Sequence, residues 1–181
     1  VCVAYSGGVD STLVAAIAHE QLGGKALAVT GISAALAPNL LKEARQQASW
    51  LSMRHQECIT EELKDPNYLN NSQNRCFACK QELHAKIKII TEVAKGAQVV
   101  DGVNHDDLKE HRPGIKAAEE AGGCSPLAEL KINKYTVRLI SRSLGFPWWD
   151  KPAQPCLASR FPYGERISTN DLQKVWRAEE W

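Results

Sequence analysis

The stretch that decides the fold is VCVAYSGGVDSTL, residues 1–13. Its first five residues are a short β-prone run that breaks at Gly7 and Gly8, and apolar residues then recur at helical spacing as far as Leu22. A second glycine pair, at residues 23–24, ends this pattern. The stretch therefore predicts a strand, a glycine turn and a helix, in that order.

The same alternation of strand and helix continues through the first hundred residues. We expect further strands at 26–32, 56–59 and 97–100, with helices that begin near Pro38 and Cys76. Strands that alternate with helices form a parallel sheet with helices on both faces. The predicted fold class is therefore α/β, a doubly wound parallel sheet that binds its ligands beyond the carboxyl ends of the strands.

Two stretches depart from this alternation. A polar, Asn-rich loop is expected at residues 67–75, and a proline-rich loop is expected at residues 148–164. We divide the chain into a nucleotide-binding domain at residues 1–145 and, at residues 146–181, a cysteine-bearing loop with the start of a C-terminal region.

The last predicted helix is capped by Ser168, and we expect it to continue to Trp181. The sequence has no initiator Met, so we expect part of a longer parent chain to be absent. The helix is still running at the last residue, and we expect the C-terminal region to be truncated. The apolar side of the helix, with Val175 and Trp176, is expected to pack on the absent part.

The composition excludes several classes of protein. With 181 residues, 44% of them apolar, the chain is large enough to bury a core without disulfide bonds. The 22 Lys and Arg residues against 21 Asp and Glu residues leave a net charge of +1, so nucleic acid is not an expected partner. No apolar run approaches the roughly 18 residues of a membrane helix, and no signal peptide pattern is present. We therefore expect a soluble, cytoplasmic protein with no membrane partner.

The first candidate site is SGGVDST, residues 6–12, between the first strand and the first helix. Free backbone N–H groups and the helix dipole favour an anion at such a place, and the glycines let the backbone approach it closely. A Walker loop would need a Lys after the second glycine, and the dinucleotide pattern GxGxxG is also absent. The stretch predicts a phosphate site of another kind, with an ordinary strand-to-helix turn as the alternative.

Cysteines form the second candidate site. Cys76 and Cys79 form a CxxC at the start of a helix, where the helix dipole and the neighbouring Arg75 and Lys80 predict lowered thiol pKa values. Cys156 follows much later in the chain, within PCLASRFPYG.

These three cysteines allow three interpretations. Three thiolates suit a [4Fe–4S] cluster that leaves one iron open to an external ligand such as sulfide. They also suit zinc, with Cys124 or a His as the fourth ligand. The third interpretation is that the thiols are unconnected, since the residues alone do not bring Cys156 to the CxxC.

Polar residues also follow the fourth predicted strand. DGVNHDD (residues 101–107) is acidic and EHRPG (residues 110–114) contains a basic residue, so this edge could hold ribose, magnesium and phosphate. Arg112 stands just ahead of a helix N-terminus, where a phosphate is favoured. We therefore take Gly102 and Arg112 as candidate ATP-binding residues, with a helix cap or a solvated loop as the alternative for the acidic residues.

The segment SGGVDS resembles the PP-loop of the ATP pyrophosphatases, which include GMP synthetase, NAD synthetase and tRNA thiolation enzymes. The resemblance implies an adenine nucleotide alpha hydrolase-like fold and an enzyme that adenylates its substrate with ATP and releases pyrophosphate. It also implies Mg²⁺ at Asp10, since Mg²⁺ prefers carboxylate and phosphate oxygens. The β- and γ-phosphates would be held by Ser6, Gly7, Gly8 and Ser11.

Five segments occur in one order: SGGVDS, RCFACK, DGVNHDDLKEHRPG, SPLAEL and KPAQPCLASRFPYG. Together they resemble the LarE family, ATP-dependent sulfur transferases that build the nickel-pincer nucleotide of lactate racemase. The resemblance implies that a carboxylate of a pyridinium biscarboxylic acid mononucleotide is adenylated and then replaced by a thiocarboxylate. Some members give up the sulfur of the cysteine that matches Cys156, and others have three cysteines and are thought to carry sulfur on a [4Fe–4S] cluster.

All three cysteines are present here, so the resemblance implies the cluster-bearing form with Cys76, Cys79 and Cys156 as ligands, fed by an external sulfide source. The catalytic candidates are then Asp10, Cys156 as a ligand and not a sacrificial donor, and Arg160. Arg160 is expected to hold a substrate or AMP phosphate near the sulfur, with a pairing to a loop carboxylate as the alternative. We expect a homo-oligomer. A tRNA thiolation enzyme and a non-catalytic nucleotide-binding module remain the alternative functions.

Overall fold

The computed structural model describes residues 1–93 and 96–180. In this part of the chain four strands form one sheet in the order β3-β2-β1-β4, and all neighbouring strands are parallel. The strands are β1 (Cys2–Ala4), β2 (Leu27–Ile32), β3 (His55–Ile59) and β4 (Val99–Val100).

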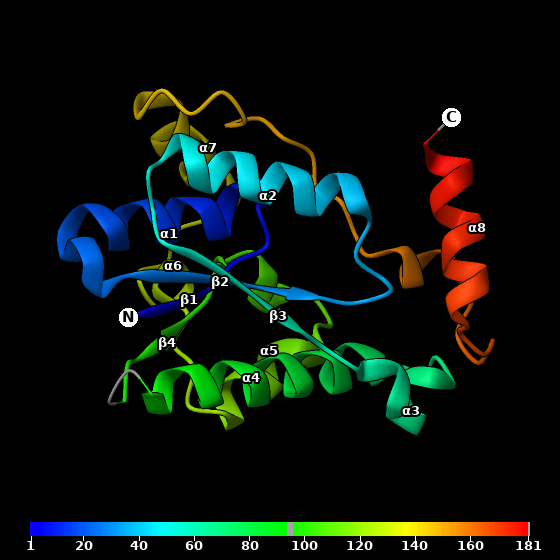
Figure 1. Cartoon of the computed structure of the whole chain (residues 1–181). Helices are drawn as coiled ribbons and strands as arrows, with labels where there is room; N and C mark the ends of the chain where they lie inside the picture. The colour runs from blue at the N-terminus through cyan, green and yellow to red at the C-terminus, as the bar shows by residue number, and fades with distance from the viewer. Residues whose placement is uncertain (94–95, 181) are drawn as a thin grey trace.

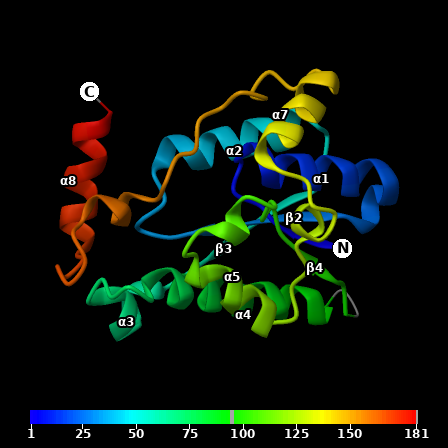
Figure 2. The ribbon, with the colours of Figure 1, turned by 180° about the vertical axis from the view of Figure 1, so that it is seen from behind.

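Helices cover both faces of the sheet. They are α1 (Val9–Leu22), α2 (Pro38–Trp50), α3 (Pro66–Leu69), α4 (Arg75–Val93), α5 (Pro113–Glu120), α6 (Pro126–Glu129), α7 (Lys134–Ser143) and α8 (Thr169–Glu179), with 3-10 turns η1 (Gly23–Lys25), η2 (Glu62–Lys64), η3 (Asp107–Lys109) and η4 (Leu157–Arg160). Helices α1, α2 and α7 lie on one face, and α4 and α5 lie on the other (Figures 1 and 2). This arrangement confirms the predicted α/β class with a doubly wound parallel sheet.

The strand order changes direction at β1. This strand pairs with β2 on one side, where Cys2 lies opposite Leu27, and with β4 on the other, where Cys2 lies opposite Val99. In an open parallel sheet such a change of direction leaves a crevice beyond the carboxyl ends of the two strands. The loops that follow β1 and β4 both emerge at this edge of the sheet, and they carry SGGVDS and DGVNHDD.

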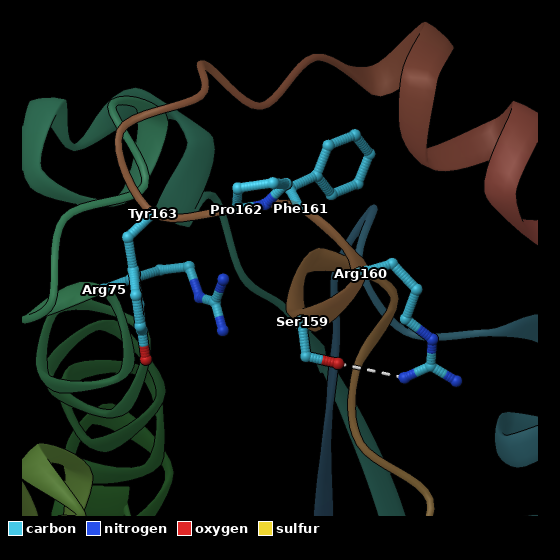
Figure 3. Close-up of a pocket in the computed structure, with 6 residues that line it drawn as sticks. All are labelled: Arg75, Ser159, Arg160, Phe161, Pro162 and Tyr163. Carbon is cyan, nitrogen blue, oxygen red and sulfur yellow. Dashed lines mark hydrogen bonds between the residues drawn. The ribbon is translucent and has the colours of Figure 1, made fainter.

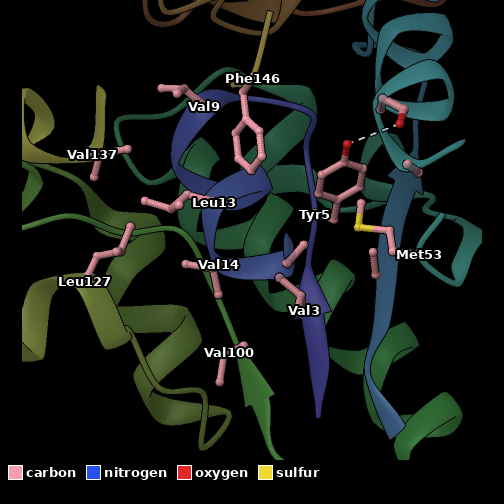
Figure 4. Close-up of a cluster of buried hydrophobic side chains, with 14 residues drawn as sticks. Val3, Tyr5, Val9, Leu13, Val14, Met53, Val100, Leu127, Val137 and Phe146 are labelled. Atoms are coloured by element: carbon pink, nitrogen blue, oxygen red, sulfur yellow. Dashed lines mark hydrogen bonds between the residues drawn. The ribbon is translucent and has the colours of Figure 1, made fainter. Parts of the chain in front are cut away.

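Two buried clusters hold the helices to the two faces of the sheet. Successive residues of a strand point to opposite faces. Val3 therefore packs with Leu13 and Val137 in the cluster of Figure 4, whereas Cys2 packs with Ile87 of α4 on the other face. The first cluster fixes α1 between the sheet and α7. It therefore also fixes the N-terminal end of α1, which overlaps SGGVDS.

A third cluster joins the C-terminal part of the chain to α3 and α4. Leu157 and Leu172 are buried there together with Tyr68. Val175 and Trp176 are half-buried against the same cluster. They therefore pack within the described chain, whereas we expected them to pack on an absent region. Helix α8 ends at Glu179, and Trp181 lies outside the described residues. The division at residue 145 stays a prediction.

The stretch 67–75, which we predicted to be a loop, overlaps the short helix α3. Pro66 stands at its first turn, and the Asp65 side chain accepts a hydrogen bond from the backbone N–H of Asn67 at 2.7 Å. These are ordinary signals of a helix start, and four residues are too few to show a helical period. Within the described residues, no helix combines the length and the apolar character needed to cross a bilayer.

The contact between the β1 and β4 loops yields a prediction. A Cβ on Gly102 would lie 2.5 Å from the backbone nitrogen of Ser11 and 2.7 Å from its Cα, which no side-chain rotation relieves. Gly102→Ala should therefore lower the free energy of unfolding by about 1–3 kcal/mol, measured by urea denaturation. Gly24→Ala is the control, because a Cβ on Gly24 would meet nothing within 4 Å. Equal stability of the two variants would contradict the close contact.

Candidate functional site

The turn from β1 into α1 forms a closed loop at a helix N-terminus. Gly7 has a φ of 70°, in the left-handed region, and a Cβ on it would lie 2.9 Å from the Cβ of Ala44. The backbone N–H of Ser6 donates to Ser11 Oγ at 3.2 Å, and the N–H of Gly8 donates to Ser6 Oγ at 3.3 Å. The two serines thus close the turn in front of a 14-residue helix, where an anion is favoured.

The carboxylate of Asp10 is held from two other elements. Its Oδ1 accepts a hydrogen bond from Asn104 Nδ2 at 3.3 Å, and its Oδ2 forms an ion pair with Lys134 Nζ. Asn104 lies in the loop after β4, and Lys134 is the first residue of α7. Three elements therefore meet at Asp10. Lys134 is a residue that sequence analysis missed, although its place directly after the helix cap Asn133 was visible.

A second lysine that sequence analysis missed also reaches this turn. Lys151 Nζ donates to the backbone oxygen of Gly7 at 3.3 Å and pairs with Glu43 Oε2 at 2.5 Å, and its side chain is only 13% exposed. Lys151 opens the segment KPAQPCLASR, which was the available signal. A fully extended chain spans about 3.6 Å per residue, so the Cα of Cys156 lies within about 18 Å of that of Lys151. The lysine therefore tethers the cysteine loop to the turn at Gly7.

The two candidates after β4 have different surroundings. Gly102 lies against the backbone of Ser11, in the first turn of α1. Arg112 pairs with Asp107 at 3.0 Å and with Glu110 at 2.8 Å, so its guanidinium is engaged by carboxylates of its own loop. Asp107 in turn accepts the backbone N–H of Asn104 at 3.0 Å. Arg112 is thus connected to Asp10 through intermediate residues and does not contact it.

The three candidate cysteines come into one neighbourhood. Cys76 and Cys79 lie at the start of α4, and Cys156 directly precedes η4. Cys76 acts electrostatically on both other thiols, and Cys156 acts on Cys79. All three are free thiols. Among residues 1–93 and 96–180, however, no group of three or more His, Cys, Asp and Glu side chains is arranged to hold a metal ion.

The thiol pKa values differ from the sequence prediction. Burial raises the pKa of Cys79 to about 12, and the Glu62 carboxylate adds to the rise. Desolvation also raises the pKa of Cys156, while the Arg75 guanidinium opposes this rise. The predicted lowering is therefore wrong for Cys79, because removal from water outweighs the nearby positive charge of Lys80.

Two buried polar groups accompany these thiols. Glu62 is 3% exposed, and its Oε2 has no hydrogen-bond partner within the described chain. The Tyr68 hydroxyl is also buried and has no hydrogen-bond partner within the described chain. Its pKa is raised mainly by burial, and the charges of Cys156 and Cys79 add to the rise. Buried polar groups normally have partners, so this neighbourhood has unused hydrogen-bonding capacity.

Arg160 lines an open cavity of about 410 Å³ with Arg75, Ser159, Phe161, Pro162 and Tyr163 (Figure 3). Its Nη1 donates to Ser159 Oγ at 2.9 Å, and its Nε pairs with Glu179. The carboxylate that pairs with Arg160 therefore comes from helix α8, whereas the alternative expectation was a pairing with a carboxylate in a loop. Arg75 enters the same cavity from the first residue of α4.

Comparison with known proteins gives three informative relatives, while no family model matches the chain. An uncharacterised protein of Synechocystis sp. is 55% identical over 177 residues, which cover 98% of this chain and 66% of that protein. The pyridinium-3,5-bisthiocarboxylic acid mononucleotide synthase of Lactiplantibacillus plantarum is 33% identical over 182 residues, 100% of this chain and 66% of the synthase. One chain of the glutamine-hydrolysing GMP synthase of Methanopyrus kandleri is 26% identical over 155 residues, which cover 80% of this chain and 49% of that one.

The thiol environments predict an order of alkylation. At pH 8, iodoacetamide should modify the exposed Cys76 much faster than Cys79, because a pKa of about 12 leaves little Cys79 thiolate. The Cys79 rate should rise about tenfold per pH unit below that pKa, measured by peptide mass spectrometry after timed quenching. Glu62→Gln should increase the alkylation rate of Cys79, because it removes a negative charge that raises the pKa of this thiol. Glu61→Gln, at an exposed residue paired with Lys64, is the matched control, and equal rates in the two variants would contradict the assignment.

Proposed function

This chain belongs to the LarE family within the PP-loop ATP pyrophosphatases, and we propose that it is an ATP-dependent sulfur transferase. Its proposed substrate is a pyridinium biscarboxylic acid mononucleotide, one carboxylate of which becomes a thiocarboxylate on the way to the nickel-pincer nucleotide. The observation that carries the proposal is the 33% identity to the Lactiplantibacillus synthase over the whole of this chain. The chain spans 66% of the length of that synthase, and the activity of the whole protein is part of the proposal.

The first half-reaction is adenylation. A carboxylate oxygen of the substrate attacks the α-phosphorus of ATP, the bond from that phosphorus to the bridging oxygen breaks, and pyrophosphate leaves. The carboxylate is already a nucleophile, so the step needs alignment and charge neutralisation more than a general base. The turn at residues 6–11 offers N–H groups to the β- and γ-phosphates, with the cations of Lys134 and Lys151 beside them.

Magnesium is the proposed metal of this half-reaction. The carboxylate of Asp10 lies in the first turn of α1 and suits Mg²⁺, which prefers carboxylate and phosphate oxygens and would neutralise phosphate charge there. Asp10 is paired with Lys134, so a metal ion held by this carboxylate would compete with the lysine for it. Lys134 could then bind a phosphate oxygen.

The second half-reaction is sulfur transfer. A sulfur nucleophile attacks the acyl carbon, and AMP leaves with the electron pair of the broken C–O bond. Cys76, Cys79 and Cys156 are the proposed sulfur-handling residues, supported by their shared neighbourhood and by the absence of disulfides among them. A [4Fe–4S] cluster with one open iron, able to accept sulfide from an external source, is the proposed cofactor. The thiols have the chemistry for it, and they would have to turn toward one another to bind it.

Arg160 is the proposed anchor for a phosphate of the substrate or of AMP. Arg160 lines the cavity of Figure 3, and its side chain, which is paired with Glu179, is 34% exposed. Planar guanidinium groups bind phosphate through two parallel hydrogen bonds. A homo-oligomer stays a prediction.

Removal of the Asp10 carboxylate tests the ATP site. Asp10→Ala should abolish pyrophosphate release in an assay with ATP, magnesium and substrate, because the proposed metal loses its protein ligand. The fold should remain, since Asp10 is outside the buried clusters. Glu20→Ala, at an exposed acid at the other end of the same helix, is the control. Unchanged pyrophosphate release from Asp10→Ala would refute the assignment.

Mass spectrometry after turnover tests the role of Cys156. With sulfide supplied, Cys156 should keep its sulfur over many turnovers, and anaerobically purified protein should be brown and contain iron. A loss of one H₂S at Cys156 for each product molecule would instead establish the sacrificial route, and the cluster proposal would then be wrong.

A further inference from the structure

The loop that carries Cys156 is fastened to the helix of the CxxC by one buried arginine. Arg75 Nη1 donates to the backbone oxygen of Ala158 at 2.8 Å and to Asn71 Oδ1 at 2.6 Å. Ala158 follows Cys156 by two residues, and Arg75 directly precedes Cys76. A single side chain thus bridges the chain segments that hold all three thiols.

Asn71 completes this bridge. Its Nδ2 donates to the backbone oxygens of Phe161 and Pro162 at 3.2 and 2.8 Å, and its backbone oxygen accepts from the N–H of Gly164 at 3.1 Å. Asn71 is fully buried and has a φ of 49°, a conformation that Asn adopts more readily than most residues. The side chain therefore fixes the far end of the same loop.

The burial of the Arg75 side chain is unfavourable in free energy. Arg75 is 5% exposed, and its hydrogen bonds among the described residues go to neutral oxygens, with no carboxylate among them. Its guanidinium carbon lies 5.9 Å from the centre of the Tyr163 ring. A buried charge with only neutral partners costs free energy compared with an apolar residue of similar size. Such a residue is expected where its geometry and charge serve the neighbouring site.

We propose that Arg75, together with Asn71, is a positioning residue that holds the Cys156 loop on the CxxC helix and so sets the spacing of the three thiols. This inference rests on the proposed function, which gives the three thiols one task. Both hydrogen bonds, to Asn71 and to Ala158, come from one guanidinium nitrogen, Nη1, so this nitrogen alone joins the two chain segments.

The test measures how readily Cys156 meets a CxxC thiol. In a Cys79→Ser background, the Cys76–Cys156 disulfide is equilibrated against reduced and oxidised glutathione, which accepts and supplies the two electrons. Peptide mass spectrometry gives the disulfide fraction, and hence the effective concentration of Cys156 at Cys76. We expect Arg75→Gln and Asn71→Asp to lower this concentration at least about tenfold, and Arg75→Lys to lower it less.

Two controls separate positioning from a general loss of stability. The Cys76–Cys79 pair in a Cys156→Ser background lies within one helix turn, so Arg75→Gln should leave its effective concentration unchanged. Arg54→Gln removes another arginine bonded to a backbone oxygen, that of Gly24 at 2.7 Å, and should change neither pair. Thermal unfolding identifies which variants are folded, and Arg75→Lys or Asn71→Asp replaces Arg75→Gln if that variant is not.

The outcomes are distinct. If the effective concentration of Cys156 at Cys76 were unchanged in folded Arg75 and Asn71 variants, the positioning role would be overturned and the proposed function would stay intact. Failure of Cys156 to pair with Cys76 in protein with Arg75 intact would overturn both, because the thiols would then share no site. A tenfold loss confined to the Cys156 pair would support the positioning role.

Discussion

The arrangement of the site depends on a close approach of two backbones, that of Gly102 after β4 and that of Ser11 in the first turn of α1. A Cβ on Gly102 would lie 2.5 Å from the Ser11 nitrogen, so only glycine allows the contact. The approach is possible because β1 and β4 are parallel neighbours, and their loops emerge at the same edge of the sheet. It also brings Asn104, two residues further on, within hydrogen-bond distance of Asp10.

A second set of contacts joins the turn at residues 6–11 to the cysteines. Lys151 is bonded to Gly7, and Cys156 follows it by five residues, while Arg75 fastens the next part of the loop to α4. The loop is therefore held at both ends of a short span. In the proposed reaction one substrate must meet ATP at the first place and sulfur at the second, so the length of this span limits how far the adenylated carboxylate has to move.

Local patterns made much of the fold predictable. The β-prone runs and glycine breaks indicated the strands, and SGGVDS lies between a strand and a helix, as predicted. Contacts between distant residues were not predictable in this way. Lys134 meets Asp10 across 124 positions and Lys151 meets Gly7 across 144. The local signals at the two lysines, a helix cap and the segment KPAQPCLASR, do not indicate these distant partners.

The prediction of a lowered pKa for Cys79 was wrong for the same reason. Lys80, next to Cys79, was visible in the sequence, and its charge does lower the pKa of Cys79 as predicted. The burial of Cys79 is a tertiary property, produced by the packing of residues 157–176 on α3 and α4. Desolvation is the larger effect, and no pattern around the CxxC carried information about it.

The ion pair between Asp10 and Lys134 has the properties of a contact that can be exchanged. The two side chains are 17% and 31% exposed, and ion pairs that water reaches contribute little net free energy. The backbone N–H of Lys134 is fixed separately, by a hydrogen bond to Asp106 Oδ2 at 3.0 Å. If a metal ion displaced the lysine from Asp10, Lys134 would remain at the edge of the turn, because its main chain does not depend on the pair. In the proposed reaction, the positive charge beside the phosphates would thus be in place before ATP binds and would only change partners.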